Sequence, residues 1–202
     1  MLATSCFFYR RPPMQTIDAS LPRVGLIGDS IMGMSEVELK AELQATTPWW
    51  MGRIINGGLT SADIAAMDGP MIDIPQLIPD AVIVEIGSFS SVLCHNAPNC
   101  DLETWVPQDY IDLLTEYHQV GIECIIVVNT NVIIDPPHNP INDAADALVV
   151  AGVVDHVADW KSEVDANPTY VYDSYGHPTQ AGQDAFAVFV AAEFVSACGD
   201  GT

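Results

Sequence analysis

Basic side chains are scarce in this sequence. It holds six lysines and arginines against 27 aspartates and glutamates, for a formal net charge of -21 at pH 7. Nucleic acids and anionic membranes are bound through clusters of basic side chains, so neither is expected as a partner. A well-solvated acidic surface that keeps the protein monomeric accounts for the charge, and a source living at high salt is the alternative.

Long apolar runs are missing as well. No stretch reaches the ~18 consecutive apolar residues of a membrane-spanning helix, and the N-terminal residues lack an apolar core of signal-peptide length. We therefore recognise neither a membrane span nor a signal peptide, and the compartment stays open, secretion included. Residues 1–20 are expected to form a flexible leader and residues 21–202 a single domain.

The five cysteines form no C-x-x-C pair, which argues against a zinc site, and no metal or other cofactor is predicted. Cys94 and Cys100 bracket a short polar loop. A small disulfide between them is one hypothesis, and two free thiols are the other. Cys124 stands in an apolar run and is interpreted as a buried small hydrophobe.

Apolar runs and helical patterns alternate along the chain. The runs predict strands at residues 24–27, 53–56, 81–86, 123–128 and 153–157. The helical patterns lie at residues 35–46, 62–67, 107–119 and 142–150, and in a long final helix from Thr179. This alternation predicts an α/β domain with a five-stranded parallel sheet.

Three loops that follow predicted strands carry candidate chemistry. They are Gly28-Asp29-Ser30, Asn56-Gly57-Gly58, and the loop that holds His177 before the last helix. The carboxyl ends of parallel strands meet at one edge of the sheet, so the three loops are expected to converge. A serine and a histidine brought together there form a nucleophile and its base.

The order of these motifs resembles the SGNH/GDSL hydrolase family. The likeness rests on Gly28-Asp29-Ser30, the glycine loop, a strand ending at Gly87, and the loop from Asp173 to His177. The stretch 157–182 is similar to the SGNH domains of peptidoglycan and polysaccharide O-acetyltransferases and related esterases. The resemblance covers the chain from about Arg23 onward. It implies a flavodoxin-like, three-layer α/β/α fold and acyl-ester chemistry without a metal.

The resemblance also implies residue roles. Ser30 would be the nucleophile and His177 its base, while Gly58 and the Ser30 backbone N–H would donate to the oxyanion. Asp29, Ser88 and Phe89 are grouped with Gly58 as candidate oxyanion or substrate-binding positions.

Two positions depart from the family pattern. The Gly-x-Asn block is Gly87-Ser88-Phe89 here, so Phe89 replaces the asparagine of the oxyanion hole, and Ser88, Ser90 or Asn129 are candidate replacements. The Asp-x-x-His block has Ser174 three residues before His177. Asp173, one residue further back, orients the imidazole if the loop bulges, and a Ser–His dyad is the alternative.

The leading hypothesis is therefore an SGNH-type serine esterase for small acyl esters, including acetyl groups on carbohydrates. An O-acetyltransferase, in which a sugar hydroxyl accepts the acyl group, is a variant of it. The alternative from another class is a catalytically impaired SGNH-fold binding module, motivated by the changes at Phe89 and Ser174.

Overall fold

The computed structural model describes residues 22–47, 49–72, 78–101, 104–131 and 139–199. Its strands form one sheet in the order β2-β1-β3-β4-β5, and every neighbouring pair is parallel. The strands are β1 Arg23–Gly28, β2 Trp50–Ile55, β3 Ala81–Glu85, β4 Cys124–Val128 and β5 His156–Ala158. The strand order reverses between β1 and β3, which is where open α/β sheets bind ligands. The expected leader, residues 1–20, lies outside the described residues.

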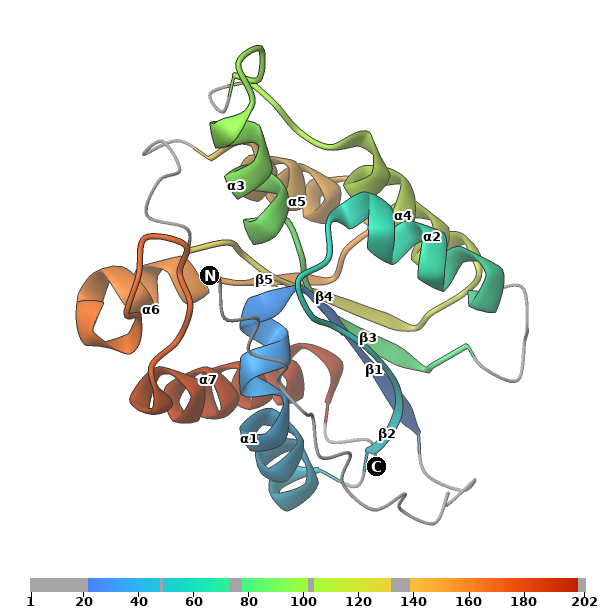
Figure 1. Ribbon diagram of the computed structural model, residues 1–202. Helices are drawn as coiled ribbons and strands as arrows, with labels where there is room; N and C mark the ends of the chain where they lie inside the picture. The colour runs from blue at the N-terminus through green and yellow to red at the C-terminus, as the bar shows by residue number, and fades with distance from the viewer. Residues whose placement is uncertain (1–21, 48, 73–77, 102–103, 132–138, 200–202) are drawn as a thin grey trace, which may run out of the picture.

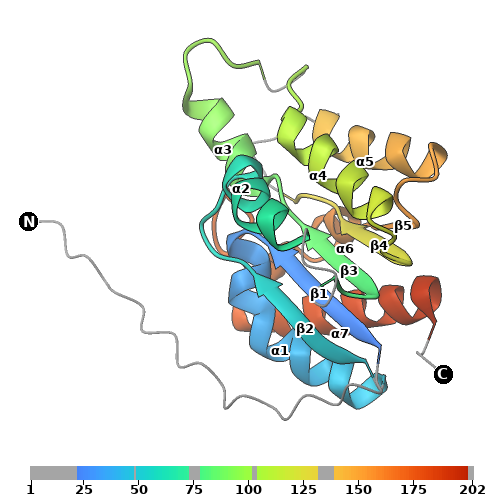
Figure 2. The same ribbon diagram turned by 90° about the vertical axis from the view of Figure 1, so that its right-hand side faces the viewer.

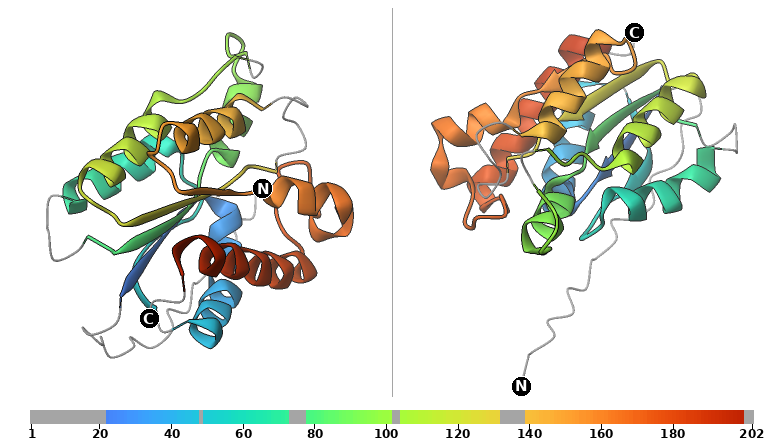
Figure 3. Two further views of the ribbon diagram at one scale, coloured as in Figure 1. Left: turned by 180° about the vertical axis from the view of Figure 1, so that it is seen from behind. Right: turned by 90° about the horizontal axis from the view of Figure 1, so that it is seen from above.

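Helices cover both faces of this sheet. They are α1 Ser30–Thr46, α2 Ser61–Ile72, α3 Ser88–Asn96, α4 Gln108–Gln119, α5 Pro140–Val150, α6 Trp160–Ala166 and α7 Gln180–Cys198, with a short 3-10 helix at Pro168–Tyr170. Helices α1 and α7 lie on one face, and α2, α4 and α5 lie on the other (Figures 1 and 2). Figure 3 shows the same layers from behind and from above. The predicted three-layer α/β/α architecture is confirmed.

Each face of the sheet buries its own apolar core. Alternate strand residues enter opposite cores, because successive side chains of a strand point to opposite faces. The α1/α7 side contains Leu26, Ile83, Ile126, Trp160, Phe186 and Phe194. The α2/α4/α5 side contains Ile27, Val84, Val127, Tyr110 and Leu114. Burial on both faces explains the nearly continuous apolar strands in the sequence.

The first helix begins earlier than the sequence predicts. The Ser-Glu pattern indicated a start near Ser35, but α1 begins at Ser30 and Ser35 is buried within it. Asp29 caps this helix, and its side chain accepts a hydrogen bond from the Ile31 N–H. The predicted start was wrong because the helix is set by this cap and by packing, not by the serine at position 35.

Other elements were missed or shifted. No helix was predicted at Ser88–Asn96 or Trp160–Ala166, where α3 and α6 lie. The former segment is rich in serine and polar residues, which are weak helix signals on their own. The last strand is β5 at His156–Ala158 rather than residues 153–157.

Two disulfides are present among the described residues. The hypothesis of a bridge between Cys94 and Cys100 is confirmed. Cys124 is buried as interpreted, but it is more than a small hydrophobe, because it is bonded to Cys198 at the end of α7. These two cysteines are 74 positions apart in sequence, and only the packing of α7 beside β4 brings their Cα atoms to 5.7 Å.

Among the described residues, α7 is the one helix long and apolar enough to cross a membrane by length and composition. Its Phe186, Val190 and Phe194 are fully buried in the core on its side of the sheet. The central helix of a layered protein has the same composition, so we interpret α7 as a core helix.

Candidate active site

The turn after β1 places Ser30 at the carboxyl edge of the sheet. β1 ends at Gly28, Asp29 caps the next helix, and Ser30 is the first residue of α1. A Cβ atom at Gly28 would lie 2.1 Å from the Met32 Cβ, so only glycine fits this tight strand-to-helix turn. The half-buried Ser30 therefore lies at the N-terminus of a 17-residue helix, where backbone N–H groups favour negative charge.

His177 comes to this serine from the other end of the chain. The Ser30 Oγ and His177 Nε2 atoms are 3.0 Å apart, although the residues are 147 positions apart in sequence. His177 lies two residues before Thr179, the N-cap of α7. The packing of α7 against α1 thus brings the histidine loop to the turn that carries Ser30.

Asp173 lies on the other side of the imidazole. Its Oδ2 atom is 2.7 Å from His177 Nδ1, and its Oδ1 atom accepts backbone N–H bonds from Tyr175 at 3.0 Å and from His177 at 3.1 Å. Gly176, with φ at +82°, lets the chain turn back at this point. Ser174, the residue three before the histidine, is exposed. With its proton on Nδ1, the imidazole donates to Asp173 and presents Nε2 to the serine as an acceptor.

The glycine loop after β2 is tied to the same turn. The Gly57 N–H donates to the Asp29 carbonyl oxygen at 3.2 Å, and the Asn56 Nδ2 donates to Glu36 Oε2 on α1 at 2.9 Å. Gly58 is exposed, and a Cβ atom placed there would meet nothing within 4 Å. The backbone at Gly58 therefore borders open space next to the serine turn.

No family model and no curated protein matches this sequence. Solved structures match most of the chain. The lipase/acylhydrolase of Enterococcus faecalis is 17% identical with a TM-score of 0.61, over 87% of this chain and 96% of that one. A catalytic mutant of an acetylxylan esterase from Geobacillus stearothermophilus is 16% identical with a TM-score of 0.63, over 88% and 94%. The chain has the SGNH/GDSL hydrolase fold.

A third similar structure is the C-terminal catalytic domain of peptidoglycan O-acetyltransferase A from Streptococcus pneumoniae. It is 16% identical with a TM-score of 0.55, over 88% of this chain and 92% of that one. Esterases, acylhydrolases and an O-acetyltransferase domain thus share this SGNH fold with the chain.

In sequence, Phe89 stands where the Gly-x-Asn pattern of the SGNH family has its asparagine. It is the second residue of α3 and half-buried, and its backbone N–H donates to Asp29 Oδ2 at 2.9 Å. The neighbouring Ser88 is buried, and its hydroxyl donates to Glu85 Oε1 at 3.1 Å. In sequence, this segment therefore has a phenyl side chain where the SGNH pattern has an amide donor.

The other candidate replacements for that asparagine are engaged elsewhere. The Ser90 Oγ accepts the Ser61 N–H at 3.2 Å, and Ser90 is buried. The Asn129 Nδ2 donates to Asp159 Oδ1 at 2.7 Å, at the start of α6. Among the described residues, neither side chain forms a hydrogen bond with Ser30. No group of three or more His, Cys, Asp or Glu side chains among them is arranged to hold a metal ion.

Two features of the site were missed in the sequence. Tyr172 and Tyr175 flank the imidazole of His177, with ring centroids 5.9 Å and 6.3 Å from it, and both are exposed. Glu85, at the end of β3, is fully buried next to Asp29. The sequence did offer a signal for Glu85, because it is an acidic residue inside an otherwise apolar predicted strand.

Proposed function

We propose that this protein is a serine esterase that cleaves small acyl esters through an acyl-enzyme. The observation that carries the proposal is the continuous chain of short contacts from Asp173 through His177 to Ser30. Nucleophile, base and orienting carboxylate in this order are the parts of a serine hydrolase, which is recognised by geometry rather than by sequence spacing.

In the first half-reaction, the Ser30 Oγ attacks the ester carbonyl carbon while its proton passes to His177 Nε2. Asp173 holds the Nδ1–H and stabilises the imidazolium that forms. The tetrahedral intermediate collapses, the bond to the alcohol oxygen breaks, and His177 returns the proton to the leaving alcohol.

In the second half-reaction, water attacks the acyl-serine and gives its proton to His177, and the carboxylic acid leaves as Ser30 recovers its proton. If a sugar hydroxyl attacks in place of water, the same steps transfer the acyl group and the protein acts as an O-acetyltransferase. The structural similarity to both esterases and an O-acetyltransferase domain supports either acceptor.

The oxyanion would be stabilised by the backbone N–H group of Ser30, at the N-terminus of α1, and by that of Gly58, in the loop after β2. Phe89 removes the amide donor of the SGNH pattern, and the loss of one such donor costs about 2.7–4 kcal/mol in a serine hydrolase. We therefore expect an esterase that is slower than a family member with the asparagine.

For the alcohol part of the substrate, we propose a carbohydrate. The exposed rings of Tyr172 and Tyr175 beside His177 offer amphipathic surfaces on which a sugar ring can lie. The excess of acidic side chains disfavours an anionic substrate.

The test is turnover of p-nitrophenyl acetate by the wild type, by Ser30→Ala and by Ser174→Ala. We expect Ser30→Ala to be inactive and the exposed Ser174→Ala to match the wild type. A fluorophosphonate should label the wild type at Ser30 and leave Ser30→Ala unlabelled by intact mass. Equal hydrolysis by the wild type and Ser30→Ala would reject the esterase.

Phe89 favours one second candidate, a catalytically impaired SGNH-fold domain that binds acylated carbohydrate without cleaving it. Its signature is binding of an acetylated oligosaccharide by calorimetry together with no fluorophosphonate labelling and no difference in hydrolysis between the wild type and Ser30→Ala.

A further inference from the structure

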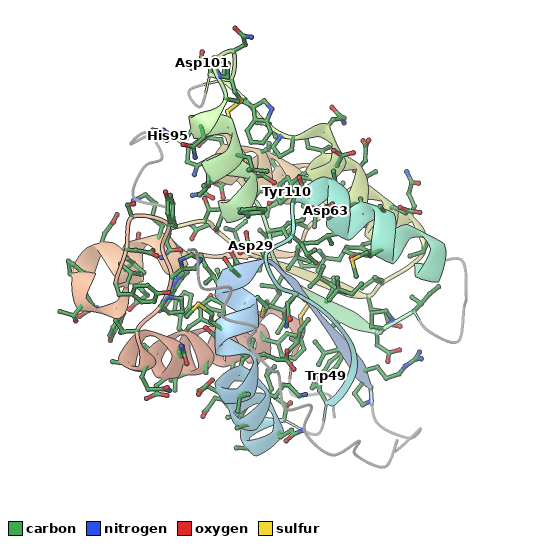
Figure 4. All side chains as sticks on the ribbon, in the orientation of Figure 1. Asp29, Trp49, Asp63, His95, Asp101 and Tyr110 are labelled. Atoms are coloured by element: carbon green, nitrogen blue, oxygen red, sulfur yellow. A yellow bond between two sulfur atoms is a disulfide. The ribbon has the colours of Figure 1, made fainter. Side chains whose placement is uncertain are left out.

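Two carboxyl groups are fully buried beneath Ser30. Asp29 follows β1 and Glu85 ends β3, and the two strands pair so that Gly28 lies opposite Glu85. Figure 4 shows Asp29 at the junction of β1 and α1. Two ionised carboxylates at such a place would be costly, because each loses its water and each repels the other.

Asp29 accepts two backbone hydrogen bonds that join separate parts of the site. Its Oδ1 atom accepts the Ile31 N–H at 3.2 Å, and its Oδ2 atom accepts the Phe89 N–H at 2.9 Å. The first donor belongs to the helix that begins with Ser30, and the second to α3. Asp29 thus links the N-termini of α1 and α3, where a negative charge is favoured.

Glu85 is held in the same network. Its Oε2 atom accepts the Met32 N–H at 3.1 Å, and its Oε1 atom accepts the Ser88 hydroxyl at 3.1 Å. The donors to the two acids are adjacent residues in both helices, Ile31 and Met32 in α1 and Ser88 and Phe89 in α3, so the two carboxyl groups lie side by side. Two carboxyl groups can hydrogen-bond to each other only when one of them carries a proton.

The surroundings decide which group is protonated. Burial raises the pKa of Glu85 well above its ordinary value, and the charge of Asp29 raises it further. Burial also raises the pKa of Asp29, but the N–H groups of Phe89 and Ile31 and the nearby His177 act in the opposite direction. Tyr110 also lies near Glu85, and burial raises the pKa of this tyrosine, so that it stays neutral.

We propose that Glu85 is a protonated positioning residue, whose carboxylic acid donates to the Asp29 carboxylate and holds the Ser30 turn against the start of α3. Only one negative charge then lies under the site. It lies at Asp29, where it favours the imidazolium that His177 becomes when Ser30 loses its proton. This kinetic consequence rests on the proposed esterase function, whereas the shared proton does not.

The proton can be counted without any activity assay. The wild type, Glu85→Gln and the control Glu123→Gln are unfolded in urea across a range of pH. Glu123 is exposed, so the control removes a carboxylate that is solvated in both states. The native protein keeps a proton that unfolded Glu85 releases near its ordinary value of 4.5. The unfolding equilibrium constant should therefore rise by up to about tenfold per pH unit between that value and the raised pKa.

We expect Glu85→Gln to lose this rise and Glu123→Gln to retain it. In difference infrared spectra at neutral pH, the band of a protonated carboxylic acid should be present in the wild type and in Glu123→Gln and absent from Glu85→Gln. If the wild type and Glu85→Gln have the same pH slope and the same carboxyl band, Glu85 holds no proton and the proposal is overturned.

Kinetics test the positioning role. The amide of Glu85→Gln is neutral and can donate to Asp29, so its kcat for p-nitrophenyl acetate should stay near that of the wild type and persist to higher pH. Glu85→Leu has no donor, and its kcat should fall while KM changes little. An equal loss of kcat in Glu85→Gln and Glu85→Leu overturns the positioning role. If Glu85→Leu does not fold, a large loss of kcat in a folded Glu85→Gln overturns it instead.

Discussion

Asp173 reaches His177 although it precedes the histidine by four positions, and its Oδ2 atom lies 2.7 Å from His177 Nδ1. The SGNH pattern has the acid three residues before the histidine, where this chain has Ser174. The turn closes because Asp173 also accepts the backbone N–H groups of Tyr175 and His177. The extra residue is accommodated in the loop while the acid still faces the imidazole.

Replacing this acid should remove most of the activity. Asp173→Asn keeps the shape of the side chain, but it no longer supplies a carboxylate to stabilise the imidazolium and fix the Nδ1–H tautomer. We expect kcat for p-nitrophenyl acetate to fall by up to about 10⁴-fold, as for an acid-to-amide change in a serine protease. Adding Ser174→Asp to Asp173→Asn should not restore it, since Ser174 points to solvent. Full activity of Asp173→Asn would indicate a Ser–His dyad.

Under the proposed esterase mechanism, adding an oxyanion donor at position 89 should make hydrolysis faster. In Phe89→Asn, the side-chain amide would stand where the family pattern has its donor, and kcat should rise by up to about 10²-fold because one such donor is worth 10²–10³ in rate. Phe89→Leu removes the ring without adding a donor and serves as the control. If Phe89→Leu gains as much kcat as Phe89→Asn, the gain comes from removing the phenyl ring and not from a new hydrogen bond.

The two disulfides should contribute unequally to stability. Removing a disulfide gives the unfolded chain more conformational entropy when the bridge had closed a longer loop. The two cysteines are 74 positions apart in Cys124–Cys198 and 6 positions apart in Cys94–Cys100. By loop entropy, the paired alanine variants should lower the free energy of unfolding by about 4 and about 2 kcal/mol respectively. Urea unfolding under non-reducing conditions measures both. Equal losses would contradict the loop-length argument, and free thiols at these positions in the denatured protein would contradict the bridges.

Tyr172, one of the two exposed tyrosines beside His177, should affect the hydrolysis of sugar esters more than that of other esters. If the sugar ring stacks on Tyr172, its removal costs about 0.5–1.5 kcal/mol, or roughly 2- to 12-fold in kcat/KM. The ratio of kcat/KM for an acetylated oligosaccharide to that for p-nitrophenyl acetate should therefore fall by this factor in Tyr172→Ala. Tyr172→Phe keeps the ring and should keep the ratio. An unchanged ratio in Tyr172→Ala would argue against a sugar at this position.

Much of the site could be anticipated from local sequence. Gly28-Asp29-Ser30 directly follows an apolar run, and the His177 loop directly precedes a long helix, so both loops were expected at the same edge of a parallel sheet. The helix at Ser88–Asn96 could not be anticipated in the same way. Its Ser90 is buried and accepts a hydrogen bond from Ser61, which lies 29 positions away in the sequence.

The sequence by itself determined the alternating α/β pattern, the Gly-Asp-Ser motif directly after an apolar run, and the phenylalanine where the family pattern has an amide donor. These are properties of neighbouring residues and of side-chain chemistry. Only the tertiary structure decided that Asp173 faces the imidazole, that Cys124 is bonded to Cys198, and that Glu85 meets Asp29 under Ser30. Each of these depends on a loop conformation or on contacts between distant segments, which neither hydrophobic periodicity nor motif spacing encodes.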